Sequence, residues 1–123
     1  MVKENACCKS ILVVEDDEDI RSALVDLLES EGYHVEPASN GKEALDKLST
    51  IEKPCLVLLD MMMPIMNGRQ FLDKIMLDSK LAPIPVLIVS AVADKANTEG
   101  SVGFLKKPID IDVVLNTVAQ YCH

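Results

Sequence analysis

The segment ILVVEDD at residues 11–17 joins four apolar residues, three of them β-branched, to three acids. An apolar run of this kind is typical of a strand that is buried on both faces, as in a parallel sheet. Two later segments repeat the pattern, CLVLLD at residues 55–60 and VLIVS at residues 86–90. Each buried strand is therefore expected to end at a polar side chain.

Apolar residues recur at helical spacing in four segments between and after these strands. The segments are Ile20–Leu28, Ala44–Ile51, Phe71–Met76 and Ile111–Tyr121. Ser39 or Asn40 can cap the second helix and Asp110 or Asp112 the last one.

Two shorter strands are expected, at Tyr33–Ala38 and Val102–Leu105. Pro37 cannot donate to a sheet ladder, so the first of them belongs at an edge. Strands that alternate with helices predict an α/β fold with a parallel sheet covered by helices on both faces. The most apolar strands belong at its centre, which favours the flavodoxin-like doubly wound arrangement with strand order 2-1-3-4-5.

The connection at residues 92–101 is short for a helical crossover and lacks large apolar side chains. We expect a shortened or irregular fourth helix there.

The length and net charge of the chain argue against several classes of function. The chain of 123 residues is one domain by length, and twelve basic against twenty acidic residues give a net charge of −8. That charge argues against nucleic acid or an anionic membrane as the main partner. No apolar run approaches the ~20 residues of a membrane span, and the first residues lack the apolar stretch of a secretory signal, so we expect a cytoplasmic protein.

The four cysteines are Cys7, Cys8, Cys55 and Cys122. Two are adjacent, which is poor geometry for an ordinary disulfide, and no Cys-x-x-Cys occurs, so a zinc site is disfavoured. We expect thiols in a reducing cytosol.

Polar side chains converge at the carboxyl edge of the predicted sheet. The residues at or just after the ends of the predicted strands are, in chain order, Glu15-Asp16-Asp17, Asp60, Ser90 and Lys107. Carboxylates held close together repel one another unless a proton or a cation intervenes, and all-oxygen ligands suit Mg²⁺. A carboxylate beside Mg²⁺, a lysine and a hydroxyl can act as a nucleophile toward phosphorus.

Each of these residues has a plainer interpretation when it is taken alone. Glu15 to Asp19 are five consecutive acids, which are common at a solvated helix start. Asp60 alone could be a turn residue, Ser90 a strand end and Lys107 a surface charge. Their joint arrival at one edge favours a functional site.

Several spaced motifs make residues 10–122 resemble a receiver domain of two-component response regulators, with residues 1–9 as an N-terminal tail. The matching segments are residues 11–17 (ILVVEDD), 58–64 (LLDMMMP), 67–68 (NG), 89–91 (VSA) and 104–108 (FLKKP). Arg21 follows Asp16 by five residues and fits the same pattern. By this register Glu15 and Asp16 resemble the metal-binding pair, and Asp17 does not.

The resemblance implies a phosphoacceptor switch. Asp60 would take a phosphoryl group from a phosphohistidine on a sensor histidine kinase or a histidine phosphotransfer protein. The Mg²⁺ cofactor would be held by Asp16, Asp60 and the backbone carbonyl of Met62, with Glu15 acting through water. Lys107 would pair with the phosphoryl oxygens.

The resemblance also implies how the switch is read by a downstream protein target. Ser90 would hydrogen-bond the phosphoryl group and Phe104 would change rotamer. The surface around residues 92–106 and the last helix would rearrange. The bond Lys107-Pro108 would be cis, as X-Pro bonds can be. Whether the chain acts alone or within a longer regulator stays open.

Two other functions compete. An Mg²⁺-dependent aspartyl-phosphate phosphohydrolase of the haloacid-dehalogenase type needs a second aspartate two residues after the nucleophile, where this chain has Met62. A flavodoxin-like cofactor carrier needs a Ser/Thr/Gly-rich phosphate loop after the first strand. Residues 15–17 are acids instead and repel a phosphate without a metal ion. We therefore favour a switch over a turnover enzyme.

Overall fold

The computed structural model describes residues 10–51, 53–61, 65–91 and 100–122. Its elements in chain order are β1 (Ser10–Val14), α1 (Glu18–Ser30), β2 (His34–Ala38), α2 (Gly41–Leu48), β3 (Leu56–Asp60), α3 (Gly68–Leu77), β4 (Val86–Ser90), β5 (Gly103–Lys106) and α4 (Ile111–Tyr121). The expected tail at residues 1–9 and residues 92–99 of the expected short helix lie outside the described residues.

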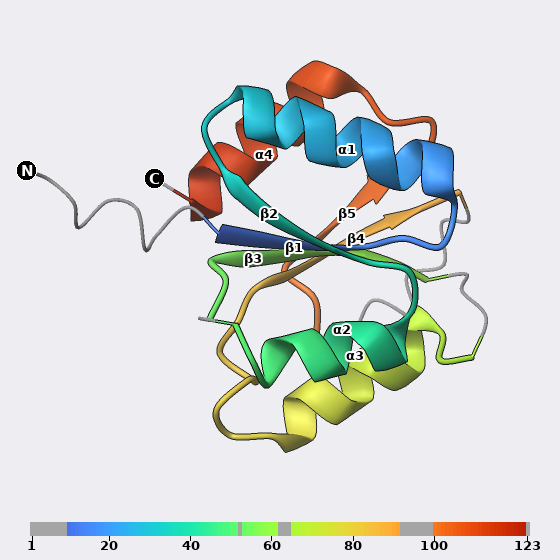
Figure 1. The fold of residues 1–123 in the computed structure, drawn as a ribbon, viewed down its shortest axis with the longest axis vertical. Helices are drawn as coiled ribbons and strands as arrows, with labels where there is room; N and C mark the ends of the chain where they lie inside the picture. Colours follow the sequence, from blue (N-terminus) through green and yellow to red (C-terminus); the bar gives the residue numbers. More distant parts are fainter. Residues whose placement is uncertain (1–9, 52, 62–64, 92–99, 123) are drawn as a thin grey trace, which may run out of the picture.

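The five strands form one parallel sheet in the order β2-β1-β3-β4-β5, which confirms the predicted order. Figure 1 shows the sheet between two layers of helices, with α1 and α4 on one face and α2 and α3 on the other. Pro37 lies in β2, an edge strand, as its missing N–H requires.

Alternate side chains of the central strands supply the two halves of the core. On one face the sheet packs against Ala44, Phe71, Leu72 and Ile75 of α2 and α3. On the other it packs against Leu24, Leu28, Val114 and Val118 of α1 and α4. The buried core therefore holds β1, β3 and β4 in place, and with them the residues at their carboxyl ends.

Side chains cap all four described helices at the N-terminus. Asp17, Asn40 and Asp110 accept a backbone N–H of the first turn of α1, α2 and α4. Asn67 does the same for α3 and forms a capping box with Gln70. Two of these caps were among the predicted alternatives, and Asp17 caps a helix instead of joining the acid pair.

The cysteines differ from the expectation of free thiols. Cys55, just before β3, and Cys122, at the end of α4, form a disulfide with Cα atoms 5.6 Å apart. The prediction was wrong because 67 residues separate the two in the sequence and only the packing of α4 along the sheet brings them together. Cys7 and Cys8 lie outside the described residues.

Among the helices of the described residues, none is long and apolar enough to cross a lipid bilayer.

Candidate functional site

The three inner strands of the sheet each end in, or just before, a buried polar side chain. Glu15 follows β1, Asp60 ends β3 and Ser90 ends β4, and these side chains are only 1–3% exposed. Polar groups are rarely buried so completely without partners, and buried charges are rarer still. The apolar core therefore ends at the carboxyl edge of the sheet, where buried polar and charged side chains begin.

Three carboxylates meet at this edge. One oxygen each of Glu15, Asp16 and Asp60 lie within 4.8 Å of one another. We call these three residues the carboxylate cluster. Their donor set is all oxygen and their charges repel at this distance, which fits a hard divalent cation such as Mg²⁺.

Lys107 supplies the positive charge next to the cluster. Its Nζ lies 2.8 Å from Glu15 Oε1 and 3.8 Å from Asp60 Oδ1. Burial alone lowers the pKa of this ammonium group, but the hydrogen bond to Glu15 and the nearby carboxylate charges outweigh burial. The pKa of Lys107 is therefore raised above its ordinary value of 10.5, and the lysine stays charged at neutral pH.

Glu15 is held in place on both sides of its carboxylate. Oε1 accepts from Lys107 Nζ, and Oε2 accepts from the backbone N–H of Asp17 at 3.1 Å. The guanidinium of Arg21 donates to the carbonyl oxygen of Glu15 at 2.9 Å and to that of Asp16 at 3.4 Å. The turn between β1 and α1 is thus fixed by hydrogen bonds to its own backbone.

The other predicted site residues lie around the cluster. Lys107 N–H donates to the Ser90 carbonyl oxygen at 2.9 Å, which joins the ends of β4 and β5. The Lys107-Pro108 bond is cis, as the resemblance implied. Phe104 is half-buried in β5 and packs against the core on the α2 and α3 face. Met62 lies outside the described residues.

Two features of the site were missed by sequence reasoning. The lysine pairs more closely with Glu15 than with Asp60, and the arginine holds backbone carbonyls of the acid pair. The position of Arg21, five residues after Asp16, is the signal that the sequence offers for the contact between the arginine and these carbonyls. The closer pairing of Lys107 with Glu15 depends on distances in the folded protein, which a sequence does not contain.

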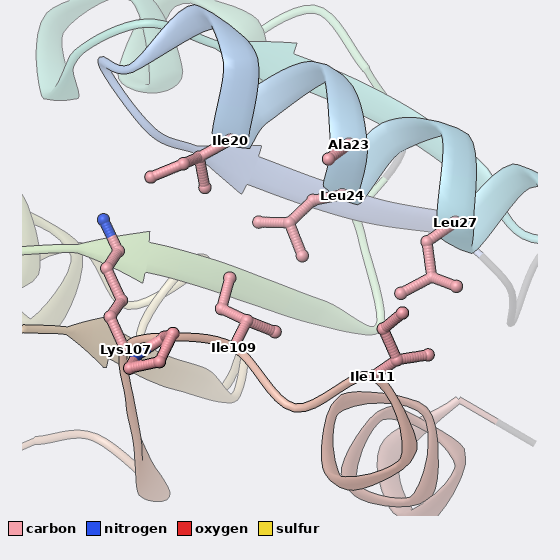
Figure 2. Close-up of a pocket in the computed structure, with 8 residues that line it drawn as sticks. Ile20, Ala23, Leu24, Leu27, Lys107, Ile109 and Ile111 are labelled. Carbon is pink, nitrogen blue, oxygen red and sulfur yellow. The ribbon is translucent and has the colours of Figure 1, made fainter.

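An apolar groove of about 380 Å³ lies beside the cluster, between α1 and the segment that joins β5 to α4. Figure 2 shows Ile20, Leu24 and Leu27 of α1 directed toward Ile109 and Ile111 across the groove. Lys107 lines one end of it. The groove therefore runs up to the residue that contacts Asp60.

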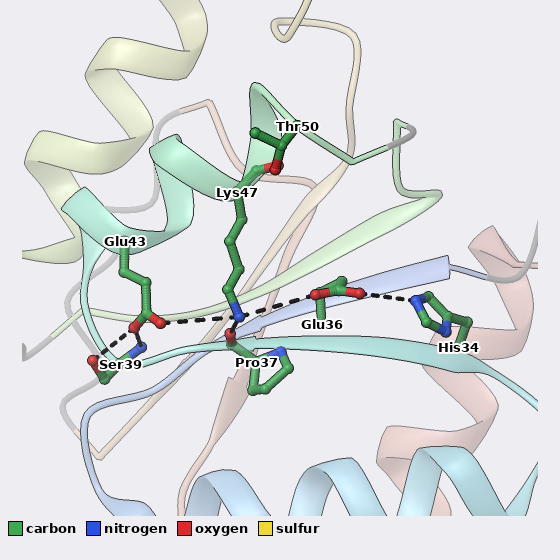
Figure 3. Close-up of polar contacts among 7 residues, drawn as sticks. All are labelled: His34, Glu36, Pro37, Ser39, Glu43, Lys47 and Thr50. Carbon is green, nitrogen blue, oxygen red and sulfur yellow. Dashed lines mark hydrogen bonds and ion pairs between the residues drawn. The ribbon is translucent and has the colours of Figure 1, made fainter.

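A second polar network lies on β2 and α2 (Figure 3). Lys47 Nζ donates to the carbonyl oxygen of Pro37 and lies 3.9 Å from carboxylate oxygens of Glu36 and Glu43. Glu43 accepts from the backbone N–H and the hydroxyl of Ser39 at 2.6 and 2.8 Å. These hydrogen bonds from Ser39 lower the pKa of Glu43 below 4.5.

Curated relatives cover nearly the whole chain. The polar-differentiation response regulator DivK of Brucella anthropi is 34% identical over 118 residues, which are 92% of this chain and 95% of DivK. DivK of Brucella ovis is 33% identical over the same shares.

Solved structures with the same fold include two response regulators. Chemotaxis response regulator CheY4 of Vibrio cholerae has a TM-score of 0.84 at 28% identity, over 91% of this chain and 97% of that one. TrrA of Thermotoga maritima, solved in complex with Mg²⁺-BeF, has a TM-score of 0.80 at 28% identity, over 92% and 98%. The family model for the response regulator receiver domain matches residues 11–119, so the chain belongs to the response regulator receiver domains.

Proposed function

We propose that Asp60 is the phosphoacceptor of this receiver domain and takes its phosphoryl group from a phosphohistidine. The single observation that carries the proposal is the surroundings of Asp60. Its carboxylate is buried at the end of β3, belongs to the carboxylate cluster and lies 3.8 Å from Lys107. A nucleophile needs such neighbours when it reacts with a phosphorus atom that carries negatively charged oxygens.

The donor atoms suggest how Mg²⁺ is shared among the acids. Both oxygens of Glu15 already accept hydrogen bonds, from Lys107 and from Asp17. In this proposal Glu15 acts through water, and Asp16 and Asp60 of the carboxylate cluster are the direct ligands. The backbone carbonyl of Met62 completes the protein's share in this proposal. When bound, Mg²⁺ neutralises charge on the transferring phosphoryl group.

The transfer itself is a substitution at phosphorus. A carboxylate oxygen of Asp60 forms the new O–P bond while the P–N bond to the donor histidine breaks, and the imidazole nitrogen keeps the electron pair of that bond. The ammonium group of Lys107 pairs with the phosphoryl oxygens, and the hydroxyl of Ser90 donates to one of them. Ser90 ends the strand that pairs with β3, and Lys107 follows β5 and lies 3.8 Å from Asp60, so the transfer needs no large movement of the sheet.

Phosphorylation then changes the surface beyond these residues. The phosphoryl group adds about −1.5 to −2 charges and three acceptor oxygens. Ser90 and Lys107 are drawn toward it, and Phe104, which precedes Lys107 by three residues in β5, changes rotamer. A downstream protein reads the change around β5, α4 and residues 92–101. The phosphoryl group shifts this equilibrium only as far as it binds one state better than the other.

The phosphodonor protein docks, in this proposal, on the apolar groove between α1 and the β5–α4 connection. The groove ends at Lys107, so a protein seated there presents its histidine close to Asp60. The neighbouring turn and first helical turn carry Asp16, Asp17, Glu18 and Asp19. The partner, a sensor histidine kinase or a histidine phosphotransfer protein, therefore combines apolar side chains with a basic rim.

Receiver domains are signalling switches, and we propose that this one promotes its own phosphorylation and dephosphorylation without acting as a turnover phosphohydrolase. The same proposal places it in the cytoplasm, where ATP supplies histidine kinases.

Incubation with Mg²⁺ and a small phosphodonor such as acetyl phosphate tests the proposal by intact mass. We expect one phosphoryl adduct on the wild-type chain, no adduct in EDTA and none on Asp60→Asn. Asp73→Asn is the matched control, because Asp73 is an exposed acid on α3 that pairs with Arg69, and it should be modified like the wild type. An adduct on Asp60→Asn, or hydrolysis of many equivalents of a phosphomonoester, would contradict the proposal.

A further inference from the structure

Two cysteines meet at the end of the sheet opposite the carboxylate cluster. Cys55 directly precedes β3, whereas Asp60 ends it, about 16 Å away at the usual rise of a strand. Cys122 follows the last residue of α4. Their disulfide therefore ties the C-terminal end of α4 to the amino end of the strand that carries Asp60.

The surroundings of both sulfur atoms suit the thiol state as well as the disulfide. Cys55 Sγ lies 3.2 Å from the carbonyl oxygen of Ser10, to which a reduced thiol can donate a hydrogen bond. Cys122 is 2% exposed and belongs to the core formed with α1, where a thiol packs as a small hydrophobic group. Opening the bond therefore places no charged or unpartnered group in the core.

Other contacts keep α4 in place when the bond is open. Val114 and Val118 are buried against the sheet, and the hydroxyl of Tyr33 lies 3.4 Å from the carbonyl oxygen of Cys122. The reduced chain thus keeps its fold, and the bond adds a restraint on the last turn of α4.

The two cysteine residues differ in exposure. Cys55 is half-buried and follows the exposed Lys53 by two residues, whereas Cys122 is almost fully buried. A small thiol or disulfide reaches Cys55 first. This asymmetry sets the order of an exchange reaction, because attack needs access to one sulfur atom.

We propose that Cys55 and Cys122 are a reversible thiol–disulfide pair that exchanges with a small disulfide of the glutathione type and sets how firmly α4 is held. In oxidation, the Cys55 thiolate attacks one sulfur of oxidised glutathione and releases one glutathione thiolate. The Cys122 thiolate then attacks the Cys55 sulfur and releases the second. The two protons of the protein thiols end on the two glutathione molecules, and reduction reverses both steps.

The position of α4 explains what the redox state of Cys55 and Cys122 would change. The N-terminal end of α4 follows the segment that begins at Lys107, which contacts Glu15 and Asp60. The oxidised pair fixes the other end to β3. Oxidation thus restrains at both ends a helix that borders β5, and reduction releases one end.

Hydrogen exchange of the unphosphorylated full chain tests the pair without depending on phosphoryl transfer. Cys7→Ser/Cys8→Ser leaves Cys55 and Cys122 as the only cysteines. The protein is equilibrated with oxidised or reduced glutathione, and differential alkylation with mass spectrometry measures the bond. We expect it to form and reopen in the folded protein. Amides of the last turn of α4 should exchange on the order of tenfold more slowly in the oxidised form.

Cys122→Ala in the same background is the control, and its exchange in α4 should not depend on glutathione. Several results would overturn the proposal. One is that both thiols of the folded protein remain open to alkylation after oxidised glutathione. Another is that the bond opens only when the protein unfolds, which makes it purely structural. A third is equal exchange of α4 in the two forms.

Discussion

At the scale of single residues, the site depends on one lysine between two buried acids. Lys107 Nζ is 1 Å closer to Glu15 than to Asp60 (2.8 against 3.8 Å). Glu15 therefore holds the lysine beside Asp60. A phosphoryl group on Asp60 would bring more negative charge to the same ammonium group and compete with Glu15 for it.

Lys107→Met should destabilise the metal-free protein, because it leaves Glu15 and Asp60 buried without their cation. We expect a loss on the order of 1–3 kcal/mol at pH 7, since the lysine is partly solvated and the full penalty for breaking a buried pair does not apply. The pKa of Lys107 is raised on folding, so this stabilisation is complete below pH 10.5 and is lost as pH rises through the folded value. Urea unfolding of both proteins between pH 7 and 11 measures the difference.

Lys42→Met is the control for that series. Lys42 forms an exposed pair with Asp46 at 3.9 Å, and exposed pairs of this kind contribute little. A loss for Lys42→Met as large as that for Lys107→Met, or a Lys107→Met difference that is unchanged at pH 11, would contradict the role given to burial.

At the scale of elements, the connection between β3 and α3 passes very close to the site. A Cβ atom at Gly68 would lie 2.7 Å from Met61 Cα and 2.8 Å from the carbonyl oxygen of Asp60. Neither backbone atom can move away without displacing the end of β3. Gly68 is therefore required for close approach of two backbone segments, not for a left-handed conformation.

Gly68→Ala should reduce the rate of phosphoryl uptake from a small donor by about tenfold or more, because misplacing a reacting group by ~1 Å is costly. Gly32→Ala is the matched control. Gly32 has φ +92° with open space around its Cα, so alanine there costs backbone strain at a distance from the site. We expect Gly32→Ala to lower the unfolding free energy and leave the uptake rate unchanged. Equal uptake rates for the two variants would refute this reading of the connection.

The turn from β2 to α2 gives a prediction for acid pH. Hydrogen bonds from the backbone and the hydroxyl of Ser39 lower the pKa of Glu43, so NMR titration should place it below 4.5. A lowered pKa stabilises the fold above pH 4.5, and that contribution is lost as pH falls through the folded value. Ser39→Ala removes only the hydroxyl and should return the pKa of Glu43 part of the way. No change in that pKa would show that the hydroxyl contact is absent in solution.

Element types and edge positions were readable from the sequence because they follow from local patterns. The apolar runs at residues 11–14 and 86–89 form β1 and β4, and Pro37 fixes β2 at the edge. Asn40 and Asp110 each start a helix through a side-chain hydrogen bond to a backbone N–H. Such features need only neighbours within a few residues.

At the scale of the whole molecule, the sequence predicted which residues reach the carboxyl edge but not how they pair there. The topology of a parallel sheet brings the strand ends together in any chain with this order of elements. Three features depend on contacts between residues that are 67 to 92 positions apart in the chain. They are the pairing of Lys107 with Glu15, the groove beside Lys107 and the Cys55–Cys122 bond. No local pattern records these contacts, and the cysteine prediction was wrong for that reason.

The central claim is that Asp60, among the acids gathered at this edge, carries the phosphoryl group. Its most direct test is to phosphorylate the wild-type protein with a small donor and Mg²⁺, trap the acyl phosphate by borohydride reduction and map the reduced residue by peptide mass spectrometry. The account predicts reduction at residue 60 in the presence of Mg²⁺ and none in EDTA. Reduction at Asp16, at another acid or independently of Mg²⁺ would contradict it.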